Sequence, residues 1–268
     1  MDEYQLKLLK KAKIIQEDCE VPHINWGDIS RFEKLSEFFI RKFKNFVDWD
    51  KISQYQSLSE PFIRDFQNEL TWWRISINQS LSESFIRKFQ LSVDWEEVSR
   101  FQTLSEPFIR EFRDKVDWML ISDCQTLSEE FIIEFQSEVF WYPISRGQKL
   151  SENFIRQFSR RVEWPSISYK QNLSEAFIRE FQNDVDWDYI SIYQTLSDDF
   201  INEFESKFNW NYYFNKKEAN FDIINKFILK SSFRNIDNFE SGHLNKNERN
   251  QISKKLSLKY AFIKEESF

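Results

Sequence analysis

The chain has 268 residues, with 44 acidic and 37 basic side chains, a formal net charge of −7, 18% aromatic residues and three glycines. An acidic chain is not typical of a nucleic-acid-binding protein, because affinity for phosphates depends on an excess of Lys and Arg. The scarcity of glycine argues against glycine-rich phosphate loops. No apolar run approaches the roughly 20 residues that a membrane-spanning helix needs, so no membrane association is expected.

The N-terminal segment is charged throughout and contains no apolar stretch of the kind found in signal peptides. The two cysteines, Cys19 and Cys124, lie far apart and belong to no motif. This pattern is typical of reduced thiols rather than of a disulfide framework. We therefore expect an intracellular protein, in which residues 1–22 form an N-terminal capping helix.

A period of 23 residues runs through most of the chain. A Leu-Ser pair marks each step, and tryptophans keep the same spacing. The Leu-Ser pairs begin at Leu35, Leu58, Leu81, Leu104, Leu127, Leu150, Leu173 and Leu196, and the tryptophans are Trp26, Trp49, Trp72, Trp95, Trp118, Trp141, Trp164, Trp187 and Trp210. A fixed period of this length indicates a repeat architecture, in which a single unit cannot bury its apolar face alone.

Each repeat is predicted to contain two helices. In the repeat that begins at Leu35, Ser36 is a good N-cap, and the four-residue spacing of Phe39, Phe43 and Val47 indicates one apolar helix face. This first helix, helix A, is predicted to have about 11 residues. Asp48 can cap a second helix, helix B, of about 7 residues.

The ends of the array depart from the repeat, as terminal units do. The array covers residues 23–210, and residues 211–241 form a degenerate ninth repeat with Asn220 at the N-cap position. Residues 242–268 are predicted to form a C-terminal cap, in which residues 256–264 could be helix or strand. The predicted fold is an all-α, right-handed-type solenoid of eight to nine 23-residue helix-turn-helix repeats with capping helices.

The most repeated polar residues favour a structural role. Ser53 and Gln56 recur at the same positions in nearly every repeat. A nucleophilic serine would be a single residue beside a base, whereas identical residues in every unit are expected to satisfy buried backbone groups between helices. His23 and His243 have no partners at metal-ligand spacing. We therefore predict no catalytic, cofactor-binding or metal-binding residue, no cofactor and no enzyme activity.

Charged residues also repeat on helix A. Glu60 precedes Arg64 by four residues, the favourable order for an ion pair within one helix, and the same pair recurs in other repeats. The stacked arginines form a ladder that could bind phosphates, but the neighbouring glutamates would largely cancel its field. Binding of nucleic acid is therefore a weaker hypothesis.

Five residues are candidates for binding a partner. Trp73, Met119, Tyr142, Tyr169 and Tyr189 are large side chains at helix B positions that the repeat leaves free. Such side chains on a stacked surface are typical interface anchors. They could equally fill gaps between neighbouring helices B, and the sequence leaves both interpretations open.

The repeat unit "LSExFIRxF…VDWxxISxxQ" resembles short repeats in proteins of giant DNA viruses that infect amoebae and other protists. The resemblance covers roughly Trp26 to Trp210. It implies a viral origin and a location in the host cytoplasm, but no activity and no functional residue.

The predicted function is a non-catalytic scaffold or adaptor that binds a protein partner, a host protein being one candidate, through the variable face of the short helices B. One alternative is a structural protein of the virion or viral factory that assembles with itself. Another is binding of nucleic acid through the arginine ladder. A monomer is favoured over an oligomer.

Overall fold

The computed structural model describes residue 10 and residues 24–214, 220–231 and 244–265, with the side chains of the last segment described through residue 259. These residues form helices, turns and loops, with no strand among them. The predicted all-α solenoid of paired helices is confirmed. The chain divides into two compact units, Met1–Val139 and Phe140–Phe268, and this division separates helix A from helix B of one repeat.

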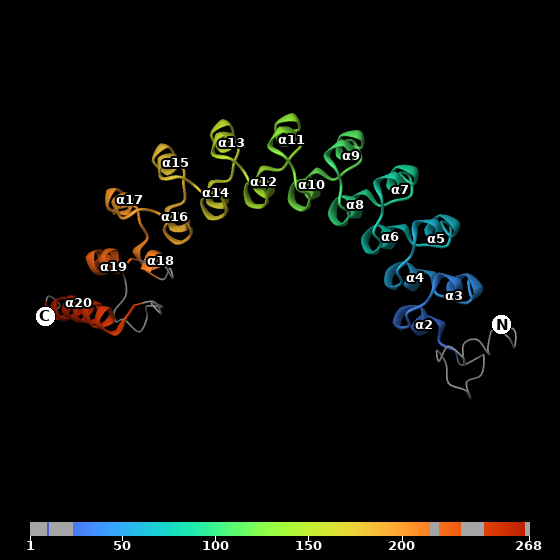
Figure 1. Ribbon diagram of the computed structural model, residues 1–268, viewed down its shortest axis with the longest axis horizontal. Helices are drawn as coiled ribbons and strands as arrows, with labels where there is room; N and C mark the ends of the chain where they lie inside the picture. The colour runs from blue at the N-terminus through green and yellow to red at the C-terminus, as the bar shows by residue number, and fades with distance from the viewer. Residues whose placement is uncertain (1–9, 11–23, 215–219, 232–243, 266–268) are drawn as a thin grey trace. The chain divides into compact units, whose positions relative to one another are not determined.

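The first unit contains two sets of short helices, which form two rows (Figure 1). Helices B begin at a tryptophan, and successive helices B of this unit pack directly on each other. They are α2 (Trp26–Phe32), α4 (Trp49–Tyr55), α6 (Trp72–Asn78), α8 (Trp95–Phe101) and α10 (Trp118–Cys124). Helices A are α3 (Glu37–Lys42), α5 (Glu60–Asp65), α7 (Glu83–Lys88), α9 (Glu106–Glu111) and α11 (Glu129–Glu134).

The second unit repeats this arrangement. Its helices B are α12 (Trp141–Gly147), α14 (Trp164–Lys170), α16 (Trp187–Tyr193) and α18 (Trp210–Phe214), and successive members are again in contact. Its helices A are α13 (Glu152–Gln157), α15 (Glu175–Glu180), α17 (Asp198–Glu203) and α19 (Phe221–Phe227). A 3-10 turn, η2 (Ile228–Lys230), and a long helix, α20 (Lys246–Glu265), follow.

The predicted caps form, but helix A is shorter than expected. The Ser36 hydroxyl accepts the backbone N–H of Phe39, and the Asp48 carboxylate caps α4. Helix α3 has 6 residues, against a predicted length of about 11, because Phe43 adopts φ −109° and ψ 24° and ends the regular helix. The chain then makes one further turn, in which the N–H of Val47 donates to the Phe43 carbonyl.

This last turn preserves the apolar spacing and explains the early end of helix A. The indole N–H of Trp49 donates to the carbonyl of Lys44 at 3.0 Å. Equivalent bonds join Trp72 to Gln67 and Trp187 to Gln182. Because each of these carbonyls already accepts an indole N–H, it does not need a backbone N–H of a longer helix as its partner.

The apolar core lies between the two rows of helices. In one repeat of the first unit, Phe62 and Ile63 of α5 and Ile75 of α6 are fully buried, and Leu70 in the intervening turn is nearly so. Full burial of such a side chain contributes about 1.5–3 kcal/mol relative to exposure. The same positions recur in each repeat, so the core is continuous within each unit.

The C-terminal segment is helical, so the strand alternative for residues 256–264 is wrong. Ile252 and Leu256 of α20 are fully buried, and α20 packs against α19 and η2. Asn220 caps α19 as expected, with Ile223 and Ile224 buried. The predicted N-terminal capping helix lies outside the described residues apart from residue 10. Among the helices that the structure describes, none is both long and apolar enough to cross a membrane.

Candidate functional site

The repeated serines join each repeat to the next. The hydroxyl of Ser53 donates to the carbonyl of Trp49 in its own helix and accepts the backbone N–H of Thr71 at 3.0 Å. Thr71 is the N-cap residue of the next helix B, so the serine satisfies an N–H that its own helix cannot use. The equivalent acceptors within the two units are Ser30, Ser76, Ser99, Ser145, Ser168 and Ser191.

The repeated glutamines form a second connection, also buried. The Gln79 amide group donates to the carbonyls of Ser53 and Gln56 at the end of the preceding helix B. Its oxygen accepts the N–H of Leu58 at 2.9 Å. One side chain therefore satisfies three backbone groups that would otherwise be buried without partners. The prediction that these serines and glutamines are structural is confirmed.

The charged residues of helix A pair differently from the prediction. The Glu60 carboxylate accepts the backbone N–H of Ser82 in the next repeat at 2.6 Å, so it is not the partner of Arg64. The arginines instead reach acids of the following repeat. These pairs are Arg41–Asp65 at 2.8 Å, Arg87–Glu111 at 2.6 Å, Arg110–Glu134 at 2.8 Å, Arg156–Glu180 at 2.7 Å and Arg179–Glu203 at 2.8 Å.

The expectation of pairs within one helix is therefore confirmed for Glu175–Arg179 and wrong for Glu60–Arg64, for a physical reason. A backbone N–H at the N-cap of the next helix is a fixed donor that the glutamate reaches without competition from its own helix. Among the predicted Glu–Arg pairs, Glu175 and Arg179 approach each other, at 3.8 Å. Because the arginines listed above are already paired with carboxylates, the ladder is a poor surface for phosphates.

These contacts shift the ionisation of several carboxyl groups. Hydrogen bonding to Arg87 lowers the pKa of Glu111, and hydrogen bonding to Arg156 does the same for Glu180. The backbone N–H of Ser197 is the main cause of the lowered pKa of Glu175. All of these groups are at the surface, so each contributes modestly to stability.

The lowered pKa values predict that stability depends on pH. A carboxylate whose folded pKa lies below its ordinary value of 4.5 stabilises the fold fully above that pH, and the contribution is lost as the pH falls through the folded value. We expect the melting temperature to decrease between about pH 5 and pH 2. Glu175→Gln should show a smaller decrease, because its amide oxygen can still accept the Ser197 N–H but carries no charge. Identical pH dependence of the two chains in thermal melts would contradict this role.

All five candidate partner-binding residues are exposed. Trp73 is 45% exposed, Met119 and Tyr142 are each 56% exposed, and Tyr169 and Tyr189 are also at the surface. All five therefore face solvent in part, and the rings of Tyr169 and Tyr189 also contact each other across neighbouring helices B. We call the exposed face of helices B the helix-B surface, and its large side chains in the second unit are Tyr142, Tyr169, Tyr189, Tyr193 and Tyr212.

Three of the five candidates meet in the second unit. Tyr142 of α12, Tyr169 of α14 and Tyr189 of α16 line a pocket of about 340 Å³ with Pro165. The rings of Tyr169 and Tyr189 are 5.7 Å apart between centroids. The pocket is also lined by Arg146, Glu163 and Ser166. The pocket thus combines apolar ring faces with hydroxyl groups that can donate or accept hydrogen bonds.

The sequence prediction omitted one member of this cluster. Tyr193 packs edge-on against Tyr169, with ring centroids 4.5 Å apart. It lies at a second variable position of helix B, four residues after Tyr189 in the same helix. A search for aromatic residues at both variable positions of adjacent repeats would have found it, because residues four apart share a helix face.

The other two candidates lie in the first unit, where Trp73 is held by charged neighbours. The guanidinium of Arg74 lies 4.3 Å from the centre of the Trp73 ring and forms an ion pair with Asp50 at 2.6 Å. This bond is the main cause of the lowered pKa of Asp50. Trp73 is therefore an exposed aromatic ring beside an arginine that is itself fixed in place.

The described residues define an all-helical repeat protein. Within the described ranges, no group of three or more His, Cys, Asp or Glu residues is arranged to hold a metal ion. His23, His243 and Cys19 lie outside those ranges, and Cys124 is a free, exposed thiol. No family model, curated protein or solved structure matches the chain.

Proposed function

We propose that this protein binds a protein partner through the helix-B surface and acts as a non-catalytic scaffold or adaptor. The observation that supports this most is the tyrosine pocket of the second unit. Its tyrosines are not needed to connect the repeats, because serine and glutamine side chains already do so. Their exposure therefore calls for another explanation, and interfaces are rich in tyrosine at their centres.

The chemistry of the pocket favours an extended segment of the partner. Tyrosine hydroxyls can bond to the carbonyl groups of an extended chain, while apolar side chains pack on the rings. Tyrosine also has few rotatable bonds, so holding it in a complex costs little conformational entropy. The resemblance to giant-virus repeats makes a protein of an amoebal host the first partner to test, and a virion protein the second.

Two other functions have less support. Binding of nucleic acid through the arginine ladder would require phosphates to displace carboxylates already bound at 2.6–2.8 Å. Self-assembly through the ends of the array would involve α20 and residues 1–22, and of the latter the structure describes residue 10. We therefore retain the helix-B surface as the proposed binding site.

Site-specific photo-crosslinking tests this proposal. A benzoylphenylalanine placed at Tyr142 should form a crosslinked product with a protein from an amoebal lysate. The same group at Gln157, an exposed position of α13 in the same unit, is the matched control and should not form that product. The proposal is contradicted if both positions give the same products, or if the Tyr142 position gives none.

A further inference from the structure

One arginine of the ladder, Arg64, lacks the acid that the other arginines of the ladder reach. In the other paired repeats, an arginine of helix A reaches an acid 24 residues later in the chain. The residue 24 positions after Arg64 is Lys88. Two cations therefore lie at positions where the other paired repeats have a cation and an anion. Arg64 has Asp65 at 3.8 Å, but Asp65 is already bound to Arg41 at 2.8 Å. Among the described residues, Lys88 forms no ion pair.

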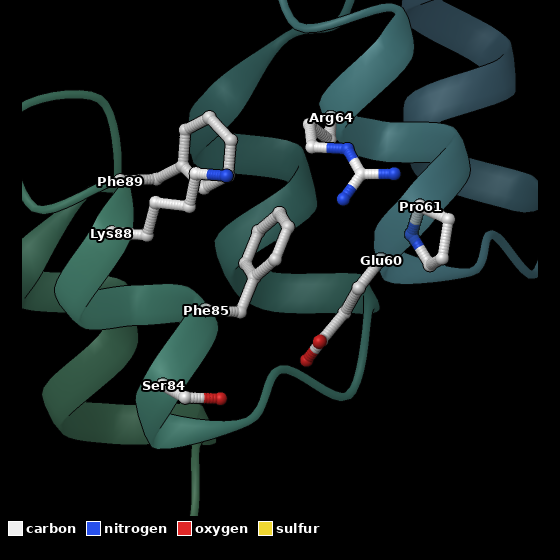
Figure 2. Close-up of a pocket in the computed structure, with 7 residues that line it drawn as sticks. All are labelled: Glu60, Pro61, Arg64, Ser84, Phe85, Lys88 and Phe89. Atoms are coloured by element: carbon white, nitrogen blue, oxygen red, sulfur yellow. The ribbon is translucent and has the colours of Figure 1, made fainter.

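The two cations border a hollow between α5 and α7. Figure 2 shows the Arg64 and Lys88 side chains extending over the same space, with the Phe85 ring between the two helices. This hollow has a volume of about 320 Å³, and Arg64, Lys88 and Phe89 also line a second one of about 750 Å³ beside it. We call the two together the helix-A groove. Leu91, at the far end of the groove, is 93% exposed.

The other charged groups near the groove are already engaged. Glu60 also lines it, but its carboxylate accepts the Ser82 N–H at 2.6 Å. Arg87 is paired with Glu111 in the next repeat. Arg64 and Lys88 are therefore left with no carboxylate of their own beyond the shared Asp65. Like charges facing each other are unfavourable, and a carboxylate placed between them would relieve that repulsion.

We propose that the helix-A groove binds an acidic segment of a protein partner. A carboxylate of that segment takes the place of the missing acid between Arg64 and Lys88, and a neighbouring apolar side chain covers the exposed Leu91. The other repeats show that arginine at this position binds a carboxylate at hydrogen-bond distance. The inference concerns helix A and does not depend on the proposed function of the helix-B surface.

A protein segment fits the groove better than a nucleic acid does. Binding to a nucleic-acid backbone needs a row of unpaired cations, whereas the groove offers two, and the chain as a whole has a net charge of −7. The exposed Leu91 also provides apolar surface that phosphates cannot use.

The test uses the full chain and the blocked peptide Gly-Glu-Leu-Glu-Gly, followed by NMR signals of the Arg64 side-chain N–H and the Leu91 methyl groups. We expect saturable shifts at both residues. The peptide with Gln in place of Glu should bind about tenfold more weakly or not at all. The variant Lys88→Glu places here the acid that the partners of Arg41, Arg87, Arg110, Arg156 and Arg179 provide, so it should fold, and it should lose binding to the same extent.

The control Lys149→Glu changes the net charge equally at an exposed site of the second unit and should bind as the wild type does. The inference is overturned if the wild type shows no saturable shift, if Lys88→Glu binds unchanged, or if Lys149→Glu loses binding equally. It is also overturned if single-stranded RNA produces these shifts and the acidic peptide does not.

Discussion

Replacing Trp118 with alanine should destabilise the protein by about 3 kcal/mol, the lower end of the range for truncating a packed tryptophan. The Trp118 ring packs on Phe135 and Phe131 of the next repeat, with centroids 5.0 and 6.3 Å apart. Its indole N–H also donates to the carbonyl of Arg113. The ring is half-buried, so part of its surface contacts water in both the folded and the unfolded protein. Only the buried part contributes to stability, and we therefore expect a loss at the lower end of the range. Urea unfolding measures the change.

Trp73→Ala is the matched control for this experiment. Trp73 is the tryptophan outside the 23-residue register, and it lies exposed beside Arg74. Its loss should cost about 0.5–1 kcal/mol, the value of an exposed cation–π contact. Equal losses for Trp118→Ala and Trp73→Ala would show that the register tryptophans do not connect successive repeats.

Gln102→Leu should produce a loss of similar size by a different route. The Gln102 side chain donates to the carbonyls of Ser76 and Gln79 at 2.7 and 2.8 Å and accepts the N–H of Leu81 at 3.0 Å. Leucine has a similar volume but leaves all three backbone groups buried without a partner. Each unsatisfied group costs about 1–3 kcal/mol, so a total loss of at least about 3 kcal/mol is expected.

Gln67→Leu makes the same chemical change at an exposed position and should alter stability by no more than about 0.5 kcal/mol. Hydrogen exchange of the Leu81 amide provides a second measurement, because that N–H loses its acceptor in Gln102→Leu. Wild-type protection of this amide in the variant would mean that the glutamine bonds are not needed to join the repeats.

Much of the fold could be predicted because each repeat signals its own local structure. Ser36 and Asp48 mark the beginnings of two helices, and the N-cap bonds form as expected. The length of helix A could not be predicted in the same way. The apolar spacing of Phe39, Phe43 and Val47 continues through a turn that is no longer regular helix, and the bond from Trp49 to Lys44 that accompanies this turn involves a different element.

The pairing of charges was predicted less well, because it depends on neighbours in the next repeat. Glu60 and Arg64 have the spacing of a pair within one helix, but a backbone N–H of the following repeat binds the glutamate instead. The distance of 24 residues between Arg41 and Asp65 becomes meaningful once successive helices A are known to lie side by side. The same comparison shows that Arg64 is followed 24 residues later by Lys88 rather than by an acid.

The candidate binding residues could be located from the sequence, but their exposure could not. Tyr142, Tyr169 and Tyr189 stand at positions that the repeat leaves free, which is visible in the sequence. Whether such side chains fill gaps or face solvent depends on how closely helices B approach each other. In the structure all three side chains face solvent, and the rings of Tyr169 and Tyr189 also contact each other across neighbouring helices B.

The most direct test of the proposed function is to measure partner binding and melting temperature together for the double variant Tyr142→Ser with Tyr189→Ser. Our expectation is a melting temperature that falls only slightly, because Tyr142 is 56% exposed and Tyr189 loses only ring contacts with Tyr169 and Tyr193. Binding to the partner identified by crosslinking should be at least about a hundredfold weaker, since a few central anchors carry most of the energy of an interface. A markedly lower melting temperature with undiminished partner binding would contradict this expectation, because the tyrosines would then serve the fold rather than an interface.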